Sequence, residues 1–140
     1  MSFQRYDPNT IHLGGPLTVD NTLASTEAIT PGMLIERTTL GWRKHTTAGG
    51  ATNAVALDHP MANKGVDDDY ASGDLVEACL AAGGTAIWGL IASGQALAKG
   101  VSVESAGNGT VRALASGVAL YKTLEAKTVT TLMRIRLEKL

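Results

Sequence analysis

Residues 101–112, VSVESAGNGTVR, show on a small scale how the whole chain is built. Two short runs with strand-forming residues flank Gly107-Asn108-Gly109, and glycine and asparagine readily adopt the positive φ angles of a tight hairpin turn. The stretch therefore predicts a β-hairpin. A second turn, Ala82-Gly83-Gly84-Thr85, lies between two apolar runs and predicts another hairpin.

Short apolar runs separated by glycine continue along most of the chain. Its 16 Gly and 4 Pro interrupt the sequence before an amphipathic helix could run long. Strands are expected at Met33–Arg37, Asp74–Leu80, Ala86–Ala92, Gly100–Glu104, Thr110–Leu114, Gly117–Tyr121 and Thr128–Leu137. Seven or eight short strands predict an all-β fold, a small β-barrel or sandwich of the β-tulip or jelly-roll kind.

The two ends of the chain differ in pattern. Residues 1–28 contain Gly14-Gly15-Pro16 and a run rich in Ser, Thr and Asn, which predicts an extended N-terminal arm that is mobile in an isolated monomer. Residues 29–140 form the predicted barrel or sandwich domain. Within it, residues 57–72 are the least regular stretch, and we expect a long contact loop there with at most one helical turn.

A short motif recurs three times: Gly32 to Glu36, Gly73 to Glu77 and Gly100 to Glu104 each read as a glycine, three strand-like residues and a glutamate. A turn glycine that begins a strand, with the glutamate emerging at the rim, would explain the motif. The first copy is followed by Trp42-Arg43 and the third by Val111-Arg112 at nearly matching offsets. These two copies are therefore interpreted as related hairpins, with chance recurrence of a common β pattern as the alternative.

Composition indicates one compact domain with a core of small side chains. Of the 140 residues, 44% are hydrophobic but only 4% are aromatic, so a deep aromatic ligand pocket is not expected. The net charge is −1 and no run of Lys and Arg could neutralise a series of phosphates, which argues against nucleic acid as a partner. Cys79 is the single cysteine, so an intrachain disulfide is excluded, and we expect a small buried hydrophobe there.

The first nine residues, MSFQRYDPN, lack the apolar stretch of a signal peptide, and no run of residues is long and apolar enough to span a membrane. We therefore expect no membrane partner and a chain that stays in the cytoplasm until it assembles.

The segment 73–120 combines GDLVE, AGGT, ASGQALAKG, ESAGNGTVR and ASGVAL in that order. This succession of glycine turns and small apolar strands resembles the capsid decoration, or cement, proteins of tailed phages. The resemblance implies a small β-rich structural virion protein that binds the outer surface of the assembled capsid and stabilises contacts between major capsid protein subunits. It also implies synthesis in the host cytoplasm and self-association at a symmetry axis, a homotrimer first and a homodimer second. The first third of the chain has no counterpart in that pattern.

No catalytic, cofactor-binding or metal-binding residue is predicted. His12, His45 and His59 are scattered without a second ligand at helical or hairpin spacing, and the acidic run 67–69 lacks the alternating spacing of a calcium loop. The residues expected at an interface are instead Trp42, Arg43, His59, Met61 and Tyr70. Trp42 stands among polar neighbours and is interpreted as an interface anchor whose truncation weakens assembly more than folding, whereas Trp88, in an apolar run, is assigned to the core.

Two other classes of protein remain open. One is a carrier domain of the biotinyl or lipoyl kind, or an unassigned small β-barrel binding module, because Leu124-Glu125-Ala126-Lys127 faintly resembles a carrier turn with its lysine. The methionine that normally flanks that lysine is absent. The other is an enzyme on a β-barrel, for which no paired acid and base is visible at a plausible spacing.

Overall fold

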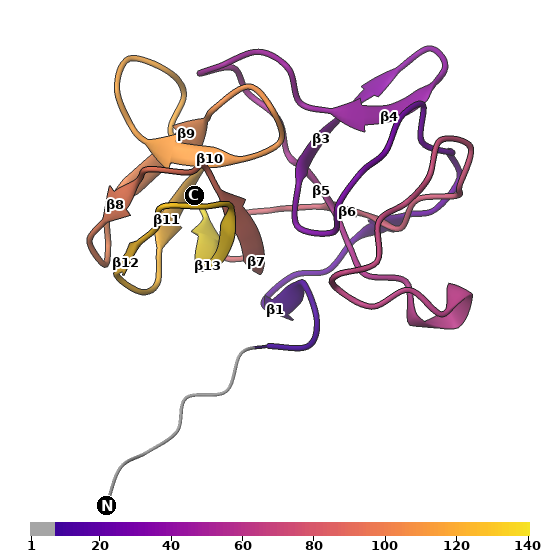
Figure 1. The fold of residues 1–140 in the computed structure, drawn as a ribbon, viewed down its shortest axis with the longest axis horizontal. Coiled ribbons are helices and arrows are strands. Elements are labelled where there is room, and N and C mark those ends of the chain that lie inside the picture. The colour runs from indigo at the N-terminus through magenta and orange to yellow at the C-terminus, as the bar shows by residue number, and fades with distance from the viewer. Residues whose placement is uncertain (1–7) are drawn as a thin grey trace, which may run out of the picture.

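The computed structural model describes residues 8–140, and these residues form two β-structures that lie side by side (Figure 1). A C-terminal barrel and an N-terminal sheet make up nearly all of the regular structure. The single helix in the described part is η1, a 3₁₀ turn at Pro60–Ala62. The all-β prediction is confirmed.

The barrel is closed by β7 and β13. Its strands follow the order β7-β10-β9-β11-β13, and β13 pairs with β7 again over six residue pairs. The closed strands are β7 (Ala86–Ile91), β9 (Ser102–Ser105), β10 (Val111–Ala113), β11 (Tyr121–Thr123) and β13 (Met133–Lys139). One short strand, β1 (His12–Gly14), joins the barrel by pairing with β7, and β8 (Ala96–Leu97) and β12 (Lys127–Thr128) form a separate two-stranded sheet. Closure leaves the barrel strands without a free edge.

The N-terminal sheet is antiparallel and has the order β2-β6-β5-β3-β4. Its strands are β2 (Val19–Asp20), β3 (Leu34–Thr38), β4 (Gly41–Lys44), β5 (Ala54–Ala56) and β6 (Ala78–Leu80). Residues 24–26 cover the outer edge of β4, because Trp42 N–H donates to the Ala24 carbonyl (2.9 Å) and Thr26 N–H donates to the Trp42 carbonyl (2.8 Å). The outer edge of β4 is therefore hydrogen-bonded to this segment at Trp42.

Alternation of side chains gives this sheet two buried faces. Leu34, Val55 and Cys79 are register partners, and they pack with barrel residues in one core cluster. On the opposite face, Ile35 and Ala54 are partners in a second cluster that includes Trp42 and Tyr70. Burial on both faces explains why these strands read as nearly continuous apolar runs. Cys79 is buried in the first cluster, as predicted.

The turn between β9 and β10 joins the two halves. The predicted hairpin at this turn is confirmed, with Ser105 opposite Val111. Gly109 has a positive φ of 81° and lies against β3, where Leu34 N–H donates to its carbonyl (2.8 Å) and its own N–H donates to the His45 carbonyl (3.2 Å). A side chain at this position would press on the Met33 side chain and the Leu34 carbonyl, and the positive φ favours glycine.

Several sequence predictions were wrong in their partners or boundaries. The strand predicted at Asp74–Leu80 begins only at Ala78, and the one predicted at Thr128–Leu137 is interrupted between β12 and β13. The turn at residues 82–85 is not a hairpin, because β6 pairs within the N-terminal sheet while β7 pairs within the barrel; it carries the chain from one half to the other. The strand predicted at Gly117–Tyr121 begins only at Tyr121, since Gly117 lies in a loop where it contacts Gly49 and Glu104.

The predicted division at residue 28 is also not a boundary in the structure. Residues 1–7 lie outside the described residues, but the rest of the supposed arm is part of the fold: β1 pairs with β7, and β2 pairs with β6. Ile11 is fully buried in the barrel-side cluster. Polar, glycine-containing sequence here reflects short strands joined by turns rather than a free arm.

Candidate interaction surface

The contact loop predicted at residues 57–72 is an ordered projection with Met61 at its tip. His59 and Lys64 exchange backbone hydrogen bonds of 2.9 and 3.0 Å across the base of the turn. Inside it, η1 is capped by Asn63, which has a left-handed φ of 61° and donates its N–H to the Pro60 carbonyl. Met61 is 97% exposed. The turn therefore presents an apolar side chain to solvent on a backbone held by its own hydrogen bonds.

Two buried or nearly buried side chains hold the loop against the body. Tyr70 is fully buried and its hydroxyl donates to the Leu57 carbonyl (2.5 Å), which ties one end of the loop to the other. Burial raises the pKa of Tyr70 to about 12, so the hydroxyl keeps its proton at neutral pH. Arg134 of the barrel donates to the Val66 and Pro31 carbonyls and to Asp67, where the Nη1 to Oδ1 distance is 2.8 Å.

Arg134 is in turn positioned by the barrel tryptophan. Its guanidinium carbon lies 5.1 Å from the ring centroid of Trp88, a cation–π distance. Trp88 is 8% exposed and belongs to the barrel-side core, as the sequence predicted. The contact loop is therefore anchored to both halves of the molecule.

A polar pocket of about 390 Å³ lies beside the turn. Its lining residues are Asn9, Asp58, Pro60, Asn63, Lys64, Gly65 and Asp68. Both carboxylates are already engaged, since Asp58 accepts from Thr10 and Ile11 and Asp68 accepts from the Gly65 N–H. Within residues 8–140, no three His, Cys, Asp or Glu side chains gather as metal ligands would.

Two of the five expected interface residues are buried in the N-terminal half. Trp42 is 3% exposed and Tyr70 is fully buried, both in the second core cluster. The interpretation of Trp42 as an exposed anchor is therefore corrected. Polar neighbours in the sequence do not indicate exposure of Trp42, because side chains alternate along a strand and Arg43 lies on the opposite face of β4. Truncation of Trp42 would open a cavity in this core and cost folding stability.

The other three lie at the surface. Met61 is the most exposed of them, whereas the side chain of His59 is 17% exposed and its Nε2 lies 3.5 Å from a carboxylate oxygen of Glu77. Arg43 has a side chain 44% exposed and an ion pair of 3.4 Å with Glu36. His59 and Met61 share the contact loop, and Arg43 stands apart from them on β4.

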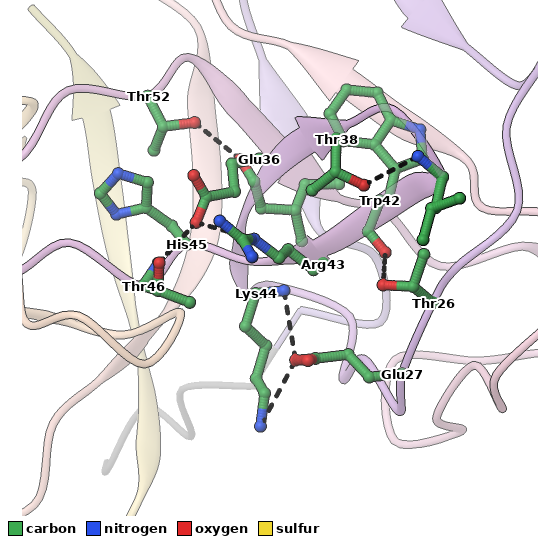
Figure 2. Close-up of polar contacts among 12 residues, drawn as sticks. Thr26, Glu27, Glu36, Thr38, Trp42, Arg43, Lys44, His45, Thr46 and Thr52 are labelled. Carbon is green, nitrogen blue, oxygen red and sulfur yellow. Dashed lines mark hydrogen bonds and ion pairs between the residues drawn. The ribbon is translucent and has the colours of Figure 1, made fainter.

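Figure 2 shows the polar network around Arg43. Glu36 accepts from the backbone N–H (2.8 Å) and hydroxyl (2.9 Å) of Thr46 and faces Arg43. Burial alone would raise the pKa of Glu36, but these donors outweigh it and hold the pKa below its ordinary value. Glu27 similarly accepts from Lys44, whose backbone nitrogen lies 3.4 Å and whose Nζ lies 3.8 Å from Oε1. The β4 edge is thus charged as well as covered.

Sequence reasoning missed two features of this surface. Leu40, at the tip of the β3–β4 hairpin, is 85% exposed; its position beside Gly41 was the available signal. A second pocket, of about 340 Å³, is lined by residues of β3, β4 and β5 and of the segment before β5, among them Glu36, Trp42 and Asn53. No local pattern predicts it, because it forms between strands that are distant in sequence.

The chain gives no match to any protein-family model and none to a curated protein. Among the described residues, no helix is long or apolar enough to cross a lipid bilayer.

Proposed function

We propose that this chain is a structural protein of a tailed-phage particle, which binds the outer surface of the assembled capsid and cements contacts between major capsid protein subunits. The observation that carries the proposal is the anchored contact loop with Met61 almost wholly in solvent. A rigid loop loses little conformational entropy when it docks, so an apolar tip of this kind suits a protein interface. The glycine-turn pattern of residues 73–120 supports the same class of protein.

The protection of strand edges from pairing with other chains also supports a structural role in many copies. The barrel is closed, and residues 24–27 cover or cap the outer edge of β4. A protein made in many copies before assembly must avoid strand-to-strand aggregation, and closed or charged edges achieve this. Contacts with other proteins are then made by side chains in turns, such as Met61 in the contact loop.

The proposal is tested by co-sedimentation of the purified chain with expanded and unexpanded heads of the phage that encodes it. We expect saturable binding to expanded heads at a fixed ratio to the major capsid protein. A homotrimer at three-fold axes is the expected stoichiometry, with a homodimer at two-fold axes as the second choice. Met61→Ser should weaken binding about tenfold, because truncating an interface anchor costs at least 1–2 kcal/mol.

A matched control is Leu132→Ser, which removes a half-exposed apolar side chain from the segment just before β13 and should leave head binding unchanged. Absence of binding by the wild-type chain to either form of head would overturn the proposal.

The carrier-domain alternative is less well supported by the geometry around its lysine. Lys127 lies on β12 and its Nζ donates to the Arg134 carbonyl (2.7 Å). Glu125, two residues before this lysine, is 7% exposed and pairs with Arg136 at 2.8 Å. A carrier lysine is presented freely at a hairpin tip, whereas this one is bonded to the body. A mass increase of one cofactor after co-expression with a biotin or lipoate ligase would reinstate the carrier alternative.

A further inference from the structure

β2 has an outer backbone edge to which no other part of the described chain is bonded. It is the end strand of the N-terminal sheet, and Leu80 N–H donates to the Thr18 carbonyl (2.8 Å), so Thr18 faces β6. Backbone groups alternate along an antiparallel strand, so those of Leu17 and Val19 point to the other side. Among residues 8–140, neither makes a backbone hydrogen bond on that side. The opposite end of the sheet differs, because residues 24–26 are bonded to β4.

The side chains on this edge are apolar as well as exposed. Leu17 is 52% exposed and Val19 is 41% exposed. Strand edges of this kind pair readily with other strands unless a charge, a bulge or a covering segment prevents it. The partner that such an edge binds is another extended segment, because its free donors and acceptors recur at every second residue. The uncovered edge of β2 is therefore a surface for strand pairing.

A second copy of β2 satisfies the backbone groups of this edge. Two such strands can run antiparallel about a two-fold axis that passes beside Val19. Val19 of one copy then lies opposite Val19 of the other, and the two residues exchange both N–H to carbonyl hydrogen bonds. Leu17 lies opposite Asn21 on either side of the axis. The outward groups of the edge thus find partners in an identical edge.

The side chains select the same partner. Residues opposite each other in an antiparallel pair share a face, so Leu17 and Val19 of both copies pack together on one face. On the other face, Thr18 lies opposite Asp20, and a carboxylate does not meet its own copy. The Asp20 carboxylate already accepts from Thr22 and lies 3.9 Å from Arg37. β2 therefore supplies both the apolar and the uncharged neighbours that its own edge requires.

We infer that two copies of this chain associate edge to edge through β2, which joins their N-terminal sheets into one sheet across a two-fold axis. The contact is isologous, so it closes at two copies. The inference rests on the proposed function, because it selects the homodimer rather than the homotrimer among the stoichiometries expected on the capsid. It uses no residue of the contact loop. Pairing also covers an edge that would otherwise promote aggregation.

Val19→Lys tests the contact, because the two-fold register sets the two introduced ammonium groups opposite each other. Sedimentation equilibrium of the 14.5 kDa chain should show a dimer for the wild type. The substitution should raise the dimer dissociation constant about tenfold or more. Val118→Lys is the matched control, since Val118 is a similarly exposed valine (48%) outside β2, and it should leave the dimer intact. Val19→Pro, which removes an N–H that β6 does not use, is the second variant if circular dichroism shows the first to be misfolded.

Mixing two variants locates the axis. Val19→Lys and Val19→Glu should each be monomeric alone, and an equimolar mixture should form a dimer, because opposite charges then face each other across the axis. Amide hydrogen exchange gives a second readout: the Val19 N–H should be protected in the wild-type dimer and should exchange rapidly after dilution to monomer.

A wild-type chain that stays monomeric overturns the inference, as does a dimer that survives Val19→Lys or a mixture that gives no dimer. Head co-sedimentation is measured separately. A monomeric wild type that binds heads would leave the proposed function standing while this inference fails. If Val19→Lys then abolished that binding, a capsid strand rather than a second copy would occupy β2. A dimer that binds neither form of head would overturn the proposed function and leave the β2 contact standing.

Discussion

The β3–β4 and β9–β10 hairpins carry the same pair of side chains in different surroundings. Glu36 lies opposite Arg43 in the first, and Glu104 lies opposite Arg112 in the second. The pairs are 3.4 and 3.0 Å apart. The carboxylate of Glu36 remains 25% exposed, whereas that of Glu104 is 1% exposed. The same Glu–Arg pairing across a hairpin thus forms a surface ion pair in one half of the molecule and an ion pair with a buried glutamate in the other.

Each glutamate also fixes a loop, and the two loops meet. Glu36 accepts from Thr46 in the segment after β4, and Glu104 accepts from the Ala115 and Gly117 N–H groups in the segment after β10. Gly49 and Gly117 are in backbone contact where these segments touch. The comparison shows that the buried Glu104 holds a loop at the junction between the halves. The more exposed Glu36 holds only the segment that follows β4.

Glu104→Gln should give the largest effect among the substitutions in these hairpins. The amide places a donor where Arg112 and two backbone N–H groups already donate, and it removes the charge that balances Arg112. We expect the Tm in circular dichroism to fall by roughly 5–10 °C, and Glu36→Gln to lower it by less than half as much. Equal losses in both variants would contradict the difference drawn between the two sites.

The same substitution should change the response to acid. The Ala115 N–H and Arg112 hold the pKa of Glu104 below its ordinary value of 4.5. A carboxyl group with a lower pKa in the folded chain contributes stability that is fully present above pH 4.5 and is lost as pH falls through its folded value. The Tm of the wild type should therefore decline below this pH, and Glu104→Gln should decline less steeply. Parallel curves would exclude Glu104 as a source of acid sensitivity.

Gly117→Ala tests the loop contact without changing a charge. A Cβ atom at Gly117 would lie 2.7 Å from the Gly49 carbonyl oxygen and 2.8 Å from a carboxylate oxygen of Glu104. Overpacking of this kind costs about 1–3 kcal/mol, measurable as a lower free energy of unfolding in urea. Gly14→Ala is the matched control, because nothing lies within 4 Å of a Cβ atom there. A neutral Gly117→Ala would mean that the loops separate at little cost.

Local turn chemistry was predictable from the sequence, and the partners of each strand were not. The Gly107-Asn108-Gly109 turn joins paired strands, as predicted, but the glycine turn at residues 82–85 joins strands of different sheets. Both turns have the residues that permit positive φ. Pairing depends on distant segments that complete each sheet, and a turn of a few residues carries no information about them.

The candidate surface was predictable to a similar extent. The contact loop was located because irregular, polar sequence between strands indicates a surface segment, and Met61 lies at its tip. The second core cluster was not found, since Ile35, Trp42 and Ala54 become neighbours only when β3, β4 and β5 pair. Trp42 was misassigned for the related reason that neighbours in a strand face opposite sides of the sheet.

Arg43→Ala should lower the free energy of unfolding least among the substitutions in the two hairpins. The guanidinium is nearly half exposed, and Glu36 keeps its hydrogen bonds to Thr46 when the arginine is removed. Exposed ion pairs contribute about 0.2–1 kcal/mol, so the free energy of unfolding in urea should fall by less than about 1 kcal/mol. Arg112→Ala is the control with the same chemistry, and it should cost more because it leaves the buried carboxylate of Glu104 without its cation. If Arg43→Ala proved the more destabilising of the two, burial of the glutamate would not explain the difference in stability between the hairpins. The charged edge of β4 would then have to contribute more to the free energy of unfolding than an exposed ion pair does.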